Sequence, residues 1–129
     1  RRRIAGMIVE LLRGEKPDDQ EAASLIMCPS PFGEWLRSRG GKEYRGVRTR
    51  RYTFVRDLEG PWLLYDNEKD PYQLDNLCGR SEHEALQERL DEVLKNKLAE
   101  TNDAFLPGIE YIRKWGYKVS KNGTVPYTP

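Results

Sequence analysis

Arginine residues interleaved with aromatic residues are the feature of this 129-residue sequence that could carry binding chemistry. The series consists of Arg45, Arg48, Arg50, Arg51 and Arg56, with Tyr44, Tyr52 and Phe54 between them. A guanidinium group holds sulfate or phosphate through paired hydrogen bonds, and an aromatic ring stacks on a sugar or a base. The series therefore predicts contact with an anion, in competition with a structural role in which the arginines pair with acidic groups of the fold.

The same stretch has the pattern of β-strands, which limits how the arginines can act together. Val47 and Thr49 are β-branched, and Trp62–Tyr65 forms a second apolar run. Asp66–Pro71 then ends the last strand, because Asp and Asn favour turns and proline lacks an amide hydrogen. We expect two or three antiparallel strands in a core sheet over 44–66, with the arginines divided between its two faces. Some of them should pair with a long acidic helix or with a further domain.

A long helix is expected after the sheet, over 81–101. Its apolar stripe consists of Leu86, Leu90, Val93, Leu94 and Leu98. Ser81 and Glu84 have the spacing of a capping box, in which each side chain accepts a hydrogen bond from the other residue's backbone amide. We expect the leucine stripe to cover one face of the sheet.

Two elements and a long connection are expected before the sheet. The spacing of apolar residues over Ile4–Arg13 predicts a short amphipathic helix, and the apolar run Ala22–Cys28 predicts a buried strand. Residues 29–43 form a long connection, since Pro29, Pro31 and Gly33 are incompatible with regular structure. Trp35 lies in this connection and either anchors it, which is the commoner case for an aromatic residue in a loop, or contacts a ligand.

The last elements complete the expected architecture. Pro107 suits the first position of a second short helix over 107–115, and Gly116 would end it. In the tail 117–129, Asn122–Gly123 signals a turn, so the tail forms a small hairpin or trails over the surface. We therefore expect one α+β domain over 1–129: a small antiparallel sheet of about four strands, one long helix packed on it and short flanking helices.

Catalytic and metal-binding patterns are sparse in this sequence. His83 is the only histidine, and with Cys28 and Cys78 it gives at most three soft ligands, whereas a structural zinc site takes four. The closely spaced acidic residues of 66–70 are explained by the turn that ends the sheet, so we expect no metal site there. The spacing of the two cysteines leaves open whether they form a disulfide. The chain alone is therefore expected to lack catalytic activity.

Two motifs follow each other within residues 45–77, RGVRTRRYTFVRD and LYDNEKDPYQLDNL. In this order they resemble the C-terminal segment of sulfatases, the sulfuric ester hydrolases of the alkaline phosphatase superfamily. That segment commonly reads R-x-V-R-T-x-R-Y-K, then L-Y-D-L-x-x-D-P-x-E-x-x-N-L, then a long helix. Thr53 stands where the family frequently has lysine, and Gln73 where it frequently has glutamate.

The resemblance implies a non-catalytic C-terminal subdomain whose partner is the upstream catalytic domain of the same polypeptide. The full-length enzyme would hydrolyse sulfate esters with formylglycine and calcium, and no cofactor is expected in this chain. Cys28 does not fit the formylglycine motif C-x-P/A-x-R, because Ser30 and Phe32 occupy the positions of the second and third motif residues. The subdomain would support the catalytic domain and help to shape the substrate pocket. Trp35, Tyr44 and Arg45 are the candidates for contacts near the substrate.

Charge is distributed unevenly, which keeps an alternative function open. Residues 1–56 hold 13 Lys and Arg against 7 Asp and Glu, and residues 57–129 hold 9 against 14, so the halves carry +6 and −5. Such asymmetry suits a free-standing basic module that binds an anionic polymer, either RNA or a sulfated glycan. It is equally explained by two halves that face each other, and nucleic acid is not the partner that the resemblance favours.

Composition fits part of a larger protein better than a self-sufficient domain. Only 37% of the residues are apolar and 33% are charged, so the core would be thin. Arg1–Arg3 stand where a methionine would open a natural chain, and we expect a fragment or a processed product. No run approaches the roughly 18 apolar residues of a membrane span. The resemblance is compatible with a periplasmic or extracytoplasmic location, which the sequence does not fix.

Overall fold

The computed structural model describes residues 23–121 and 123–124. The expected helix over Ile4–Arg13, Asn122 of the expected turn and the end of the tail lie outside the described residues. The described elements are β1 (Ser24–Cys28), η1 (Arg37–Arg39), β2 (Tyr44–Arg48), β3 (Tyr52–Asp57), β4 (Pro61–Asp66), η2 (Ser81–His83), α3 (Glu84–Thr101) and α4 (Gly108–Trp115).

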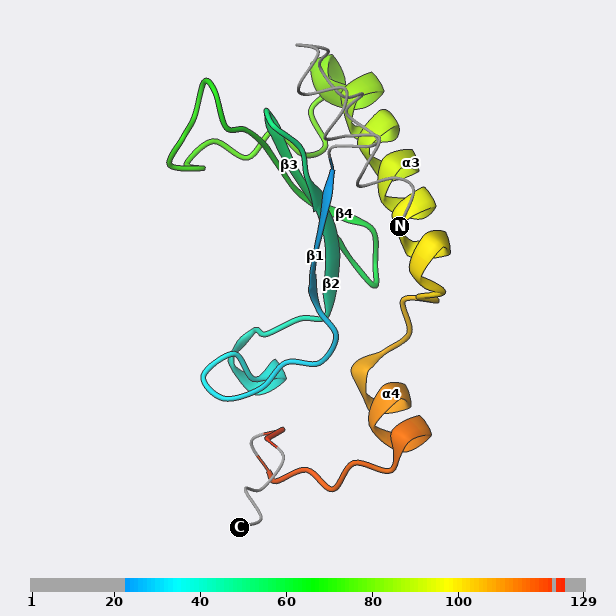
Figure 1. Cartoon of the computed structure of the whole chain (residues 1–129). Helices are drawn as coiled ribbons and strands as arrows, with labels where there is room; N and C mark the ends of the chain where they lie inside the picture. Colours follow the sequence, from blue (N-terminus) through cyan, green and yellow to red (C-terminus); the bar gives the residue numbers. More distant parts are fainter. Residues whose placement is uncertain (1–22, 122, 125–129) are drawn as a thin grey trace, which may run out of the picture.

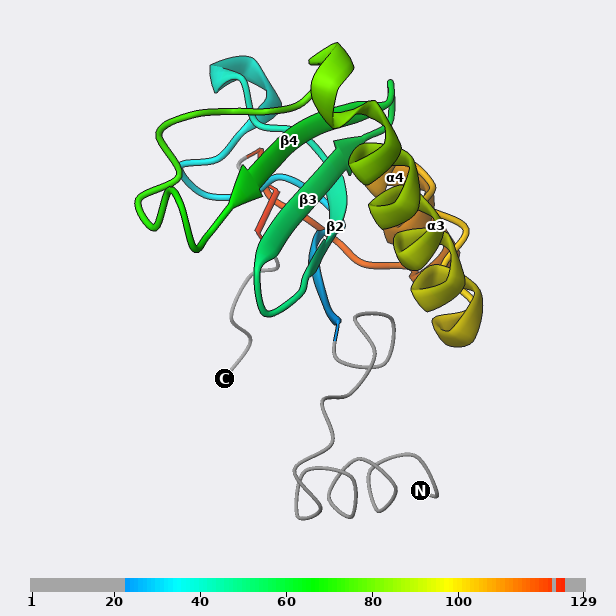
Figure 2. The same ribbon diagram turned by 90° about the horizontal axis from the view of Figure 1, so that it is seen from above.

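The four strands form one antiparallel sheet in the order β1-β2-β3-β4, and α3 runs alongside one face of it (Figures 1 and 2). The register places Val47 opposite Phe54 and Phe54 opposite Leu64, so one row of apolar side chains crosses three strands. α4 follows α3 beyond the end of the sheet (Figure 1). This arrangement confirms the expected α+β fold with a small antiparallel sheet, a long helix and a shorter helix.

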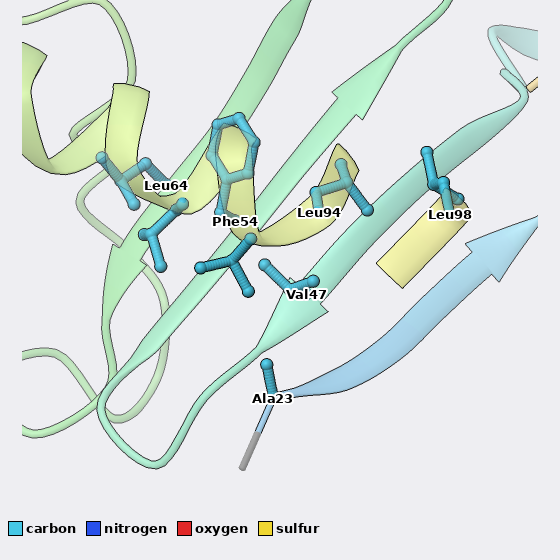
Figure 3. Close-up of a cluster of buried hydrophobic side chains, with 8 residues drawn as sticks. Ala23, Val47, Phe54, Leu64, Leu94 and Leu98 are labelled. Carbon is cyan, nitrogen blue, oxygen red and sulfur yellow. The ribbon is translucent and has the colours of Figure 1, made fainter. Parts of the chain in front are cut away.

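The core lies between the sheet and α3 (Figure 3). Its buried members are Ala23, Val47, Phe54, Leu64, Leu90, Val93, Leu94 and Leu98. The leucine stripe expected from the sequence thus covers the sheet, with Leu86 packed at its margin. Full burial of each such side chain contributes roughly 1.5–3 kcal/mol of transfer free energy, before the loss of conformational entropy is counted.

A β-bulge in β4 changes which face one aromatic residue occupies. Val55 pairs with Leu63, whereas Arg56 pairs with Pro61, so Trp62 is an extra residue between the two pairs. The ring of Trp62 then lies 6.2 Å from the ring of Tyr44, on the sheet face opposite α3. Alternation of side chains in a regular strand would not predict this placement.

The beginning of the long helix differs from the sequence expectation. Ser81 does not cap α3, because residues 81–83 form the short 3₁₀ turn η2 and α3 begins at Glu84. The amide of Glu84 donates to the carbonyl of Ser81 within this turn, which satisfies the donor that a capping side chain would have taken. The capping-box prediction is therefore wrong, although the helix itself and its end near Asn102 are confirmed.

Three other expectations have a structural outcome. The run Ala22–Cys28 contains a strand, but β1 is an edge strand, paired only with β2 and only partly buried. Asp66 ends β4 as expected, and its carboxylate accepts hydrogen bonds from the backbone amides of the turn that follows. Pro107 caps α4 instead of opening it, and Gly116 ends the helix with a positive φ of 66°.

Candidate functional site

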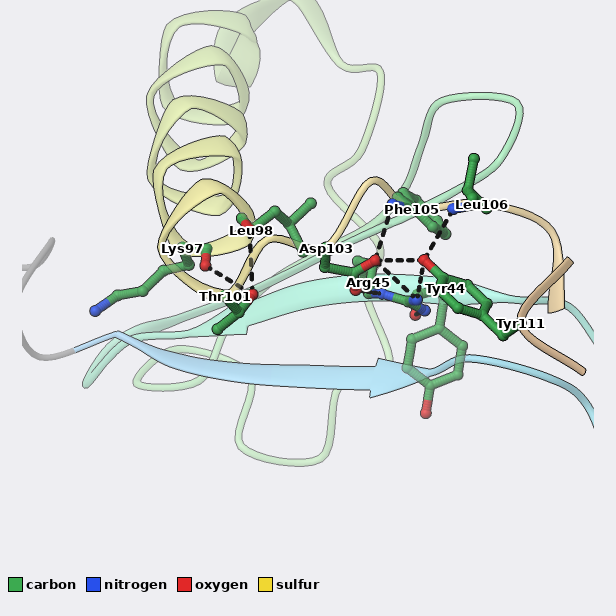
Figure 4. Close-up of polar contacts among 9 residues, drawn as sticks. All are labelled: Tyr44, Arg45, Lys97, Leu98, Thr101, Asp103, Phe105, Leu106 and Tyr111. Carbon is green, nitrogen blue, oxygen red and sulfur yellow. Dashed lines mark hydrogen bonds and ion pairs between the residues drawn. The ribbon is translucent and has the colours of Figure 1, made fainter. Parts of the chain in front are cut away.

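Arg45 is the centre of the polar site that joins the sheet to the helices (Figure 4). Its side chain is 1% exposed, and its Nε donates to Asp103 Oδ2 at 2.5 Å. The guanidinium group lies 4.8 Å from the centre of the Phe105 ring and donates to Tyr111 Oη at 3.5 Å. The charge of Arg45 is therefore neutralised inside the fold, where bulk solvent does not reach it.

The end of α3 positions the acidic partner of Arg45. Asn102 ends the helix with a positive φ of 53°, and Asp103 follows directly. Asp103 Oδ1 accepts hydrogen bonds from Tyr111 Oη at 2.5 Å and from the Phe105 amide at 2.8 Å. Burial raises the pKa of Asp103, but the hydrogen bonds from Arg45, Tyr111 and this amide outweigh burial and hold the pKa below its ordinary value.

Arg51 and Arg56 also pair with acidic residues within the fold. Arg51 donates to both carboxylate oxygens of Asp66, with a shortest distance of 2.7 Å. Arg56 Nη1 donates to Asp91 of α3 at 2.9 Å, which confirms that an arginine of the sheet pairs with the long helix. The other two members, Arg48 and Arg50, are exposed at the β2–β3 hairpin, where Arg48 donates to the Thr53 hydroxyl at 3.2 Å. Three of the five arginines thus hold the fold together.

The candidate substrate residues lie apart in the structure. Tyr44 faces the bulged Trp62 on the open face of the sheet, whereas Arg45, its neighbour in β2, points to the helix side. Trp35 is 42% exposed in the loop before β2, and its indole Nε1 donates to the Lys42 carbonyl at 3.3 Å. This hydrogen bond ties the loop to itself. Tyr44 and Arg45, on opposite faces of the sheet, therefore do not converge on one point.

Sequence reasoning missed the partners of Arg45. Asp103 is 58 positions from Arg45, and Tyr111 is 66 positions from it. Neither residue belongs to a periodic pattern or a motif, so spacing offered no signal for either. The one available indication was charge: an arginine between apolar neighbours of a central strand needs a buried acidic partner.

A cavity of about 300 Å³ opens beside this cluster. It is lined mainly by apolar atoms, and its residues are Met27, Pro29, Arg45, Thr101, Asn102, Asp103, Tyr111, Lys114 and Trp115. The Trp115 ring stacks on the Tyr111 ring with 5.4 Å between their centres. The cavity could accept an apolar group, whereas its arginine and carboxylate are engaged with each other.

The described residues provide no group of three or more His, Cys, Asp or Glu side chains arranged for a metal ion. Cys28 and Cys78 are both free thiols, so they do not form a disulfide. Burial raises the pKa of the Cys28 thiol, although Arg45 nearby lowers it, and burial also raises the pKa of Cys78. Both thiols are thus less ready to act as nucleophiles than an exposed cysteine. Within 23–121 and 123–124, no helix is long and apolar enough to cross a membrane.

Comparison with known proteins identifies relatives of this chain. No family model matches it. It is 42% identical to the ulvan-active sulfatase of Formosa agariphila over 123 residues, which cover 92% of this chain and 22% of that protein. The chain therefore spans about a fifth of the length of the relative.

Two solved structures share its fold. One is a protein in complex with its substrate D-glucosamine-2-N,6-O-disulfate, with a TM-score of 0.58 and 22% identity over 73% of this chain and 18% of that one. The other is a 2-O GAG sulfatase, with a TM-score of 0.56 and 23% identity over 74% of this chain and 20% of that one. The resemblance indicated by the motifs of residues 45–77 is confirmed: the chain matches the C-terminal segment of a sulfatase.

Proposed function

We propose that this chain is the non-catalytic C-terminal subdomain, residues 1–129, of a sulfatase that hydrolyses sulfate esters. The proposal is carried by the sequence match to an ulvan-active sulfatase. The match spans nearly the whole chain but only about a fifth of the relative. Ulvan is accordingly the first substrate to test with the full-length enzyme. The chain itself supplies no step of the reaction.

The chemistry of the described residues supports a structural role. The buried Arg45 is paired with Asp103. Burial raises the pKa values of the Cys28 and Cys78 thiols, so neither readily forms a thiolate. The residues following Cys28 do not fit the formylglycine motif, and the described carboxylates do not gather as calcium ligands would. Formylglycine and calcium, which the relationship to sulfatases implies, would then be held by the rest of the enzyme.

Trp35 and Tyr44 are the residues of this subdomain that we place nearest to the substrate pocket. Trp35 is exposed and Tyr44 is partly exposed, and neither belongs to the core between the sheet and α3. Such rings can stack on the sugar that carries the sulfate ester. Arg45 would act indirectly, because its ion pair with Asp103 fixes the start of the connection to α4.

Sulfate release from ulvan tests this function. The full-length enzyme is expected to release sulfate, whereas the 129-residue chain at the same concentration should release none. Turnover by the purified chain would overturn the non-catalytic role, and failure of the full-length enzyme on all sulfated polysaccharides and aryl sulfates would overturn the assignment as a sulfatase. Trp35→Ala and Tyr44→Ala should raise KM more than they lower kcat if these residues contact the substrate.

The alternative, a free-standing module for anionic polymers, is supported by Arg48 and Arg50, which remain exposed at the hairpin. Binding that depends on counterion release weakens steeply with salt. Retention of the chain on heparin resin at low salt, lost on a modest increase in salt and on the double substitution Arg48→Gln with Arg50→Gln, would favour this alternative. We expect the chain to pass through the resin.

A further inference from the structure

α4 is amphipathic, yet its apolar side is largely uncovered. Ile109, Ile112 and Trp115 recur on one side of the helix. Ile109 is 44% exposed and Trp115 is 58% exposed, and within α4 only Gly108 is buried. Short helices gain most of their stability from burying such a side. The described residues do not provide the cover that this helix needs.

The uncovered surface continues onto neighbouring segments. We define the α4 lobe as residues 29–36 together with residues 105–121. The two segments touch, because a Cβ atom on Gly108 would lie 2.6 Å from the carbonyl oxygen of Pro29. Further exposed apolar side chains of the lobe are Phe32, Leu106, Tyr117 and Val119. Most of the large apolar side chains exposed in the described residues lie in this lobe, and clusters of this kind mark interaction sites.

The lobe is held in a fixed orientation before any partner binds. Tyr111 Oη donates to Asp103, which is paired with Arg45 of β2. The Gly108 amide donates to Glu43 Oε1 at 2.8 Å, and Glu43 is buried directly before β2. The buried Glu43 and the partly buried Asp103 thus join the start and the middle of the lobe to the sheet. A surface that is ordered in advance loses little conformational entropy on binding.

We propose that the α4 lobe is the surface through which this segment docks onto the remainder of the sulfatase polypeptide. The proposal rests on the proposed function. The partner that covers the lobe is inferred from the length of the relative, of which about four fifths lies outside the match. A covalently linked partner is present at high effective concentration, so it competes well against partners in solution. The cavity beside Trp115, about 300 Å³ and mainly apolar, would accept a side chain of that partner.

Hydroxyl-radical footprinting tests this surface by comparing the 129-residue chain with the full-length enzyme. Trp115 should be oxidised at least about fivefold more slowly in the full-length enzyme, because burial shields an aromatic ring from solvent. Leu58, in the β3–β4 hairpin and 42% exposed, is the reference and should be oxidised at the same rate in both. Equal rates at Trp115 would overturn the proposal.

A matched pair of substitutions gives a second measurement. Ile109→Asn and Leu58→Asn remove apolar side chains of nearly equal exposure, 44% and 42%. In the 129-residue chain, each should change the folding equilibrium constant by less than about threefold. In the full-length enzyme, Ile109→Asn should lower the folding equilibrium constant by about tenfold, because it would remove a buried side chain. Leu58→Asn should remain without effect there, and equal effects of the two substitutions would overturn the docking surface.

Other occupants of the lobe predict different results. Protection of Trp115 that appears only when a sulfated polysaccharide is added would overturn the proposal in favour of a sugar platform. Protection in the 129-residue chain that disappears on dilution would overturn it in favour of a second copy. Sulfate release is measured separately, so an enzyme that releases sulfate without protecting Trp115 refutes the docking surface alone. Protection without sulfate release refutes the proposed reaction and leaves the surface intact.

Discussion

α3 and α4 are both amphipathic helices, but only α3 has its apolar side covered by the described residues. Leu90, Val93, Leu94 and Leu98 of α3 are buried against the sheet. On α4, Trp115 remains more than half exposed although the apolar side of this helix is more sharply defined than that of α3. An apolar stripe therefore indicates that a helix has a partner, whereas the identity of that partner depends on the rest of the fold.

The two regions also differ in how polar groups are used. On the α3 side, apolar packing dominates, and the ion pair of Arg56 with Asp91 lies at the margin, partly exposed. On the α4 side, the buried pair of Arg45 with Asp103 provides the connection. Ion pairs fix orientation better than they add stability. Polar contacts therefore fix the orientation of the α4 lobe, although few of its apolar side chains are buried.

The largest effect is expected from Leu94→Ala, in the covered region. Leu94 is 0% exposed, and loss of a buried leucine side chain should lower the free energy of unfolding by about 2–5 kcal/mol. Urea denaturation of the 129-residue chain measures this change. Leu58→Ala, at a site 42% exposed, is the control and should stay within about 0.5 kcal/mol of the parent chain. Similar losses at both sites would mean that α3 is not the principal cover of the sheet.

A second prediction concerns the ion pair of Arg45 with Asp103, which joins the α3 region to the α4 lobe. Arg45→Met leaves the Asp103 carboxylate without its cation and should lower the free energy of unfolding by about 2–4 kcal/mol, less than for a fully buried pair because the Asp103 side chain is 13% exposed. The double substitution Arg45→Met with Asp103→Leu removes both charges, so it should be less destabilising than the sum of the single substitutions. A double-mutant cycle on urea midpoints measures the coupling. Additive losses would show that the two residues do not interact.

Much of the covered region could be predicted from the sequence, because its signals are local. The leucine stripe of 81–101 and the strand pattern of 44–66 each specify one element and one buried side. The bulge at Trp62 and the edge position of β1 could not be predicted, since both depend on how strands pair. The capping box also failed because of backbone hydrogen bonding. The Glu84 amide, which the Ser81 hydroxyl was expected to bind, donates to the Ser81 carbonyl in η2.

The site was harder to predict than the fold. Arg45 was predicted to contact the substrate, which stays a prediction, and its internal partners were missed: Asp103 lies in the connection after α3, and Tyr111 lies in α4. Aromatic and charged residues in a strand are compatible with ligand binding and with internal pairing. Only the position of the acidic partner distinguishes the two, and that position depends on where α3 ends.

Gly108→Ala should produce a smaller effect that is confined to the α4 lobe. An added Cβ would lie 2.6 Å from the Pro29 carbonyl oxygen and 2.6 Å from Ser30 Cβ, so the loop or the helix has to move. Overpacking of this kind costs about 1–3 kcal/mol. Hydrogen exchange should accelerate in residues 29–36 and 108–115 and remain unchanged in the central strands. Faster exchange across the sheet would contradict the separation of the two regions.

The smallest expected effect is on the acid side of the stability profile, and it concerns Asp103, which joins the two regions. The pKa of Asp103 is lower in the folded chain than in the unfolded chain, where an aspartate titrates at about 3.9. Its contribution to stability is therefore complete above that pH and is lost as the pH falls through the lower folded value. Asp103→Asn should flatten the fall in stability between about pH 5 and pH 3, where the unfolded carboxylate takes up its proton. Asp57 and Asp66 have lowered pKa values as well, so part of the slope will remain. Urea midpoints of both chains across this range measure the difference, and superimposable slopes would mean that the Arg45 pair does not favour the ionised carboxylate.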